Sequence, residues 1–75
     1  MIENDDEVIV LTQKYYTTKE ACYILGIANS GTIRKYIYMN LLRAKRNQTN
    51  EWLITCDSLA EKLIRQGRPA IIRLK

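Results

Sequence analysis

Between residues 15 and 63 the chain carries signals for three short helices and a β-hairpin, with almost no residues to spare between them. Thr17-Thr18-Lys19-Glu20 has the pattern of a capping box, in which the Thr17 hydroxyl accepts from the Glu20 amide and the Glu20 carboxylate accepts from the Thr17 amide. Ala21, Ile24 and Leu25 then fall on one helical face, and Gly26 suits the left-handed residue that ends a helix. A first helix of about two turns is predicted here.

A second helix is predicted after the turn Asn29-Ser30-Gly31, which has N-cap chemistry. In the run Thr32 to Met39, Ile33, Tyr36 and Ile37 recur at the spacing of one helical face and should point to the core. Asn40 can adopt the left-handed conformation that closes the helix. The residues left on the outer face are Ser30, Gly31, Arg34, Lys35 and Tyr38.

From Leu42 the period changes to two, and the run 42–46, the polar loop 47–51 and the run 52–55 together predict a β-hairpin. Asp57-Ser58 is the predicted cap of a third helix, which Gly67 and Pro69 should end. The buried stripe expected on that helix is Leu59, Leu63 and Ile64.

The two ends of the chain differ in character from this central part. Residues 1–13 form an acidic tail in which 1–7 are too polar to offset the entropy of ordering and are expected to be disordered. Val8 to Leu11 is strand-like and would either pair with the hairpin or cover the core. Residues 68–75 end in an apolar run that is either a docked strand or a contact for another chain, so the domain itself is placed at 14–67.

Charge and size limit the function. Glu3, Asp5, Asp6 and Glu7 hold half of the eight acidic side chains, so residues 8–75 carry all twelve basic side chains against four acidic ones. A cationic domain of this kind attracts polyanions, and nucleic acid is the leading class of partner. An anionic membrane surface would also fit the charge, but no apolar run approaches the roughly 20 residues of a span. A soluble, intracellular protein is expected.

The sequence gives little indication of a catalytic site or a metal site. The chain has no histidine, no phosphate-binding glycine loop, and no serine or cysteine with a base nearby in sequence. Two cysteines without histidine do not make an ordinary zinc site, so Cys22 and Cys56 are expected to be free thiols. The alternative is a disulfide, which would imply an oxidising compartment. The carboxylates at Glu20, Glu51, Asp57 and Glu61 are isolated and suit caps or solvated surface. We therefore expect a protein that is not an enzyme and that uses no cofactor or metal.

The outer face of the second helix is the clearest candidate for binding DNA. An α-helix fits the major groove, and arginine can bind guanine through two hydrogen bonds, which makes Arg34 the first choice for base contact. Lys35 would meet a base or a phosphate, and Tyr38 the sugar-phosphate backbone. Ser30, Gly31 and Thr32 begin the helix, where free amides attract phosphate. A solvated face and ordinary capping are the alternative explanations.

The hairpin carries a second basic cluster, Arg43, Lys45, Arg46, Asn47 and Gln48, which would follow the DNA backbone or enter a minor groove. The alternative is that these residues serve solubility alone. Trp52 would either stack on a base or belong to the core, and core is favoured in so small a domain. Tyr15 and Tyr16 are expected to pack on the first helix, with one of them free to reach a phosphate. Thr17, at the start of the first helix, completes the predicted DNA contacts.

The sequence also resembles a known family. Residues 16–21, 25–27, 32–37, 42–44 and 52–54 together resemble the excisionase-type helix-turn-helix proteins, which are relatives of the MerR DNA-binding domain. The resemblance implies a mainly α fold with a small β-hairpin, a winged helix-turn-helix. It assigns base reading to Arg34 and Lys35, and backbone or minor-groove contacts to the hairpin arginines and Lys45. Two departures are a turn at 28–31 that is one residue longer than usual and Asn40 in place of glycine.

The resemblance further implies the task. Members of the family either bend phage or transposon DNA to assist an integrase or regulate transcription. A short chain of this type is similar to an excisionase or a small regulator of a mobile element. The resemblance implies a cytoplasmic, nucleoid-associated protein that a bacterium or a phage encodes. Its expected partners are double-stranded DNA, an integrase or recombinase, and neighbouring copies of itself on DNA. The alternative is a protein-interaction module of a phage or plasmid complex that no longer reads DNA.

Overall fold

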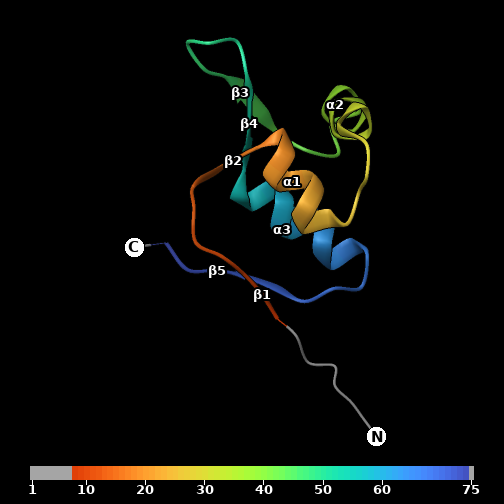
Figure 1. The fold of residues 1–75 in the computed structure, drawn as a ribbon. Helices are drawn as coiled ribbons and strands as arrows, with labels where there is room; N and C mark the ends of the chain where they lie inside the picture. Colours follow the sequence, from red (N-terminus) through yellow and green to blue (C-terminus); the bar gives the residue numbers. More distant parts are fainter. Residues whose placement is uncertain (1–7, 75) are drawn as a thin grey trace, which may run out of the picture.

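The computed structural model describes residues 8–74, and the expected disorder of residues 1–7 lies outside the described residues. The described part is a small mixed α/β domain with more strand than the single hairpin expected from the sequence (Figure 1). Its elements in chain order are β1 (Ile9–Leu11), β2 (Tyr15–Thr17), α1 (Thr18–Leu25), α2 (Ser30–Tyr38), β3 (Ala44–Arg46), β4 (Trp52–Thr55), α3 (Cys56–Arg65) and β5 (Ala70–Ile72).

The hairpin predicted at residues 42–55 is present as β3 and β4, whose register pairs Ala44 with Ile54 and Arg46 with Trp52. On its other side β4 pairs with β2, so three antiparallel strands lie in the order β2-β4-β3. Strand β2 was not predicted, because three residues are too few to show an alternating pattern. The Tyr16 side chain on it is buried, and the Tyr16 hydroxyl accepts hydrogen bonds from the Thr12 and Gln13 amides.

The start of α1 is the capping box that the sequence predicts. The Glu20 amide donates to the Thr17 hydroxyl at 3.1 Å, and the Thr17 amide donates to the Glu20 carboxylate at 2.9 Å. At the other end Gly26 has a φ of 71°, and the Ile27 amide donates to the Cys22 carbonyl at 2.8 Å. Both predicted ends of the first helix are therefore confirmed.

Replacing Thr17 with alanine should lower the free energy of unfolding by about 1 kcal/mol, because the Glu20 amide loses its acceptor at the exposed helix start. The measurement is urea unfolding followed by circular dichroism. Thr18→Ala is the matched control, since Thr18 follows the cap and alanine has the higher helix propensity. Equal losses in the two variants would show that the capping box contributes nothing.

The second helix starts and ends on the two predicted asparagines. The Asn29 side chain accepts from the Gly31 amide at 2.8 Å, and Asn40 adopts a φ of 61°. The Leu41 amide then donates to the Tyr36 carbonyl at 2.8 Å, which is the closure that follows a left-handed residue. Of the predicted core-facing residues, Ile33 is fully buried, while Tyr36 and Ile37 are half-buried and pack against the core. The predicted orientation of α2 is confirmed.

The third helix differs from its prediction in its N-cap residue and in its buried face. Thr55, not Asp57-Ser58, is the N-cap, and its hydroxyl accepts from the Ser58 amide at 3.3 Å. The helix starts at Cys56, and its buried face is formed by Cys56, Leu59 and Leu63, together with Ala60. The predicted burial of Ile64 is wrong, as that side chain is 58% exposed. The stop at Gly67, with a φ of 79°, is as predicted.

The core lies where the helices meet the inner face of the three-stranded sheet. Its largest fully buried apolar side chains are Leu11, Ile33, Leu42, Ile54, Leu59 and Leu63. Ser58 is the buried polar residue among those described, and its hydroxyl lies 3.0 Å from the Thr55 carbonyl and 3.3 Å from the Arg43 carbonyl. Since these groups satisfy the hydroxyl, Ser58 ties the start of α3 to the hairpin. Both cysteines are free thiols, as expected.

The two ends of the described chain pair with each other. β1 and β5 form a two-stranded parallel ribbon, with Ile9 beside Ala70 and Leu11 beside Ile72. This settles two alternatives, because Val8–Leu11 covers the core instead of joining the hairpin and residues 70–72 are a docked strand. Leu11 is only 1% exposed, so both segments that the sequence placed in tails take part in the described fold.

Candidate nucleic-acid interface

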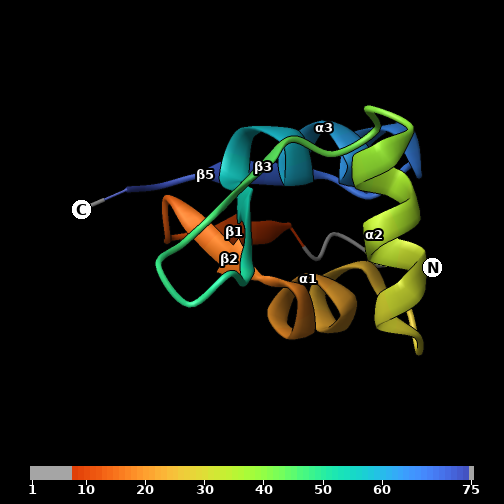
Figure 2. The ribbon, with the colours of Figure 1, turned by 90° about the horizontal axis from the view of Figure 1, so that it is seen from above.

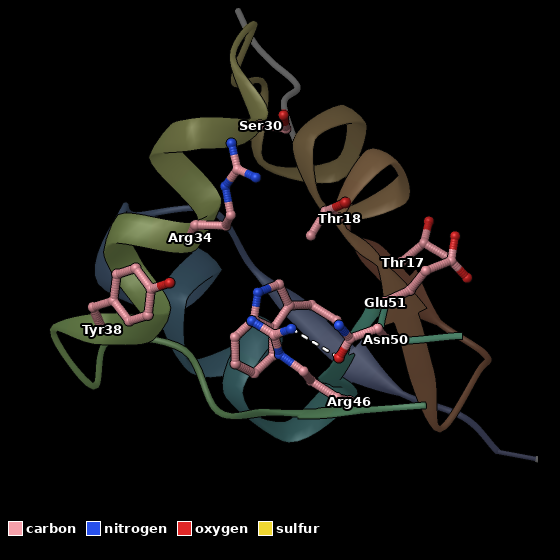
Figure 3. Close-up of a pocket in the computed structure, with 9 residues that line it drawn as sticks. Thr17, Thr18, Ser30, Arg34, Tyr38, Arg46, Asn50 and Glu51 are labelled. Atoms are coloured by element: carbon pink, nitrogen blue, oxygen red, sulfur yellow. Dashed lines mark hydrogen bonds between the residues drawn. The ribbon is translucent and has the colours of Figure 1, made fainter. Parts of the chain in front are cut away.

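A cleft of about 320 Å³ separates α2 from the β3–β4 hairpin, with the start of α1 as its third wall (Figure 3). It gathers residues that are up to 35 positions apart in the sequence, from Thr17 to Trp52. The lining residues are Thr17, Thr18, Ser30, Arg34, Tyr38, Arg46, Asn50, Glu51 and Trp52. Five of the predicted DNA contacts, Thr17, Ser30, Arg34, Tyr38 and Arg46, therefore face one common space.

On the α2 wall, three of the predicted residues stand one above the other. Ser30, Arg34 and Tyr38 recur at intervals of four, which places them on one helical face. Figure 3 shows the Arg34 and Tyr38 side chains projecting from the helix on the side of the cleft. Tyr38 is 71% exposed, so its hydroxyl and much of its ring are available to a partner.

On the hairpin wall, Arg46 is held in place from two sides. Its guanidinium lies 4.4 Å from the centre of the Trp52 ring, and its Nη1 donates to Asn50 Oδ1 at 2.8 Å. Trp52 itself is half-buried and packs against the core. Trp52 is thus a fixed surface at the edge of the core. Because it already restricts the Arg46 side chain, Arg46 loses less conformational entropy when it binds an anion.

The hairpin loop owes its shape to Asn47. The Asn47 carbonyl accepts from the Asn50 amide at 3.0 Å, and its side-chain oxygen accepts from the Thr49 and Glu51 amides. Asn50 has a φ of 67°, which completes a type I turn followed by a left-handed residue. Because the Asn47 side-chain oxygen is used inside the loop, Asn47 is a turn-forming residue here. Gln48 lies exposed in the loop, outside the cleft lining.

The alternation of side chains along β3 divides the predicted hairpin cluster between two faces. Arg46 shares the face of Ala44, which is turned toward the core and the cleft. Lys45 lies on the opposite face, with its Nζ 4.5 Å from the centre of the Tyr15 ring. Arg43 forms an exposed ion pair with Glu61 at 3.6 Å. The structure therefore does not bring Arg43 and Lys45 together with Arg46.

The start of α2 offers fewer free amides than the sequence suggested. The Gly31 amide donates to the Asn29 side chain and the Thr32 amide donates to the Asn29 carbonyl. Gly31 and Thr32 are also half-buried and do not line the cleft, whereas Lys35 is exposed on α2 beside it. An anion at this helix end would have to compete with the cap.

Four lining residues were not among the predicted contacts, namely Thr18, Asn50, Glu51 and Trp52. The sequence favours a core position for Trp52 over stacking on a base, and the structure places Trp52 at the edge of the core with part of its surface lining the cleft. Glu51 brings a carboxylate to the cleft, where it accepts from the Thr49 hydroxyl at 3.1 Å. No local pattern marks Asn50 or Glu51, because only the folded loop turns them toward α2.

No protein-family model, curated protein or solved structure matches the chain. None of the helices within residues 8–74 has the length and apolar composition of a membrane span. In the same described range, no three histidine, cysteine or acidic side chains gather in a way that would hold a metal ion.

Proposed function

We propose that the chain is a sequence-specific DNA-binding protein with a winged helix-turn-helix, similar in type to the excisionases. The observation that carries the proposal is that α2 and the hairpin present one arginine each, Arg34 and Arg46, to the same cleft. A helix suits the major groove, and a hairpin loop beside it suits the neighbouring groove. The hairpin takes the role of the wing.

The cleft has a direct role in this arrangement. In duplex DNA a sugar-phosphate strand separates the major groove from the minor groove, so a helix in one and a hairpin in the other must straddle that strand. The cleft would receive it, with Arg46 on one side and Tyr38 on the other. Arginine binds phosphate oxygens in pairs, and hydroxyls such as those of Thr17, Thr18 and Ser30 are common partners of the DNA backbone.

Sequence would then be read by residues at the rim of the cleft. Arg34 lines the cleft from α2, and Lys35 is exposed on the same helix. In the proposed complex both side chains reach the floor of the major groove, where guanine presents two acceptors to a basic side chain. The Glu51 carboxylate repels phosphate and would favour a backbone path closer to Arg34. We further propose that such binding serves recombination or transcription of a mobile element, with a recombinase or further copies of the chain as partners.

The first test is a titration of a labelled random duplex, followed by fluorescence anisotropy at several salt concentrations. If about four phosphates are neutralised, affinity should fall by about 100-fold between roughly 50 and 200 mM salt, because the released counterions oppose binding. Site selection from a random library would then follow. No binding at low salt would overturn the proposal and favour a protein-interaction module that does not read DNA.

A further inference from the structure

The flank of α2 that faces away from the cleft carries a second basic site. Lys62 reaches it from α3, which lies beside the C-terminal end of α2 in Figure 2. The Lys62 Nζ is 4.5 Å from the centre of the Tyr36 ring. Because Tyr36 is half-buried and packs against the core, its ring is a fixed surface next to the ammonium group. The positive charge is therefore held in one place before any partner binds.

The helical period places this site and the cleft on opposite flanks of α2. Successive residues of an α-helix are about 100° apart, so Arg34 and Tyr36 lie on either side of Lys35. Arg34 lines the cleft, and Tyr36 contacts Lys62. Lys35, between them, is exposed. The outward side of α2 therefore has positively charged side chains on both of its flanks.

The acidic residues of the two helices do not neutralise this flank. α2 contains no acidic residue, and α3 contains Asp57 and Glu61. Glu61 forms an ion pair with Arg43 at 3.6 Å, so that pair adds no net charge, and Asp57 lines a pocket beside β2 instead. Arg65, exposed and about one turn after Lys62, adds a further positive charge to α3. Within the described residues, the surface around Lys62 therefore suits an anion.

The geometry of duplex DNA indicates which anion this is. The major groove is about 12 Å wide and a helix with its side chains is about 10–12 Å across, so a helix in the groove lies close to both sugar-phosphate strands. In the proposed complex the cleft receives one of these strands. The other strand then passes the opposite flank of α2, where Tyr36 and Lys62 lie. A lysine ammonium is a compact charge that binds phosphate well.

We propose that Lys62 binds the sugar-phosphate strand on the far side of the major groove, with Tyr36 as its positioning residue. This inference rests on the proposed DNA binding and extends it from one strand to two. α2 is then held between both strands, by Arg46 and Tyr38 on one side and by Lys62 on the other. Contacts on both sides fix the rotation of α2 in the groove, which contacts on one side alone do not.

The first arm of the test measures the affinity of Lys62→Gln for a duplex by fluorescence anisotropy. Losing one phosphate contact should weaken binding about five- to tenfold at roughly 0.1 M salt, because one fewer counterion is released. Lys62→Arg keeps the charge and the contact with the ring, so it should bind within about twofold of the wild type. Lys14→Gln is the matched control, since Lys14 is exposed outside the cleft lining and should change the affinity less than about twofold. Circular dichroism checks that each variant is folded.

The second arm locates the contact on one strand. Single phosphates of the duplex are replaced in turn by neutral methylphosphonates, and the affinity of each duplex is measured. The wild type should lose affinity when a contacted phosphate is replaced on either strand that borders the major groove. Lys62→Gln should become insensitive to replacements on the far strand only, and Arg46→Ala to replacements on the strand in the cleft only.

Two results would overturn the Lys62 contact and leave the proposed function standing. One is a folded Lys62→Gln variant that binds as tightly as the wild type or stays sensitive to the same phosphates on both strands. The other is an equal loss of affinity in Lys62→Gln and Lys62→Arg, which would mean that Lys62 acts through packing and not through its charge. A wild-type chain that binds no duplex at low salt would contradict the contact and the proposed function together.

Discussion

Replacing Arg46 with alanine is expected to weaken binding to duplex DNA about tenfold or more, whereas the same change at Arg43 should weaken it less than about threefold. Both residues are hairpin arginines, and both substitutions remove one positive charge. They differ in position: Arg46 lies in the cleft on the Trp52 ring, and Arg43 pairs with Glu61 outside the cleft lining. Any difference between the variants therefore reports the site of contact and not the net charge.

Anisotropy titrations of one selected duplex at fixed salt would measure the two affinities, with Arg34→Ala as a third variant. Arg34→Ala should match or exceed the loss at Arg46, because it removes the residue that α2 contributes to the same cleft. The salt slope should fall by about one for each phosphate contact that is removed. Equal losses at Arg43 and Arg46 would mean that the hairpin acts only through its charge, and that the cleft is not the binding site.

Leu59→Ala should destabilise the fold by about 2–5 kcal/mol, while Ile64→Ala on the same helix should cost less than about 1 kcal/mol. Leu59 is 0% exposed in the centre of the core, so shortening it leaves a cavity among the surrounding apolar side chains. Ile64 is 58% exposed, and water already contacts most of it. A domain of this size has little stability in reserve, so the Leu59 variant should unfold at a much lower urea concentration than the wild type.

Urea unfolding of both variants, monitored by the fluorescence of Trp52, gives the two free energies. The single tryptophan packs at the edge of the core and should report its loss. The comparison also tests which face of α3 is buried, because the predicted stripe would bury Ile64 together with Leu59 and Leu63. A large loss of stability in Ile64→Ala and a small loss in Leu59→Ala would contradict the described orientation of α3.

Local hydrogen bonding explains which elements were predictable. Thr17 with Glu20, Asn29 before α2, and the left-handed residues Gly26 and Asn40 act within one helical turn, so their partners are visible in the sequence. The start of α3 was missed by two residues because Thr55 ends a strand and caps the helix at once. A residue that ends a strand and also caps a helix matches neither sequence pattern by itself.

The candidate site was only partly predictable for a related reason. Arg34 and Tyr38 follow from the helical period of α2, and this period depends on the chain near them alone. Arg46 lies on one face of the hairpin, and Arg43 and Lys45 lie on the other. This division depends on which face of β3 packs against the core, and the inward packing of Ala44 fixes that face. The stacking of Arg46 on Trp52 depends in turn on the register of β3 with β4.

The sequence by itself determined the ends of α1 and α2, the hairpin and the cationic character of residues 8–75, since each depends on neighbours in the chain or on composition. Tertiary structure alone decided the pairing of β1 with β5, the addition of β2 to the sheet and the cleft itself. Those features join segments up to 61 residues apart, as Ile9 and Ala70 are. Short apolar strands can pair with many partners, and only the burial of Leu11 and its neighbours in a common core selects one.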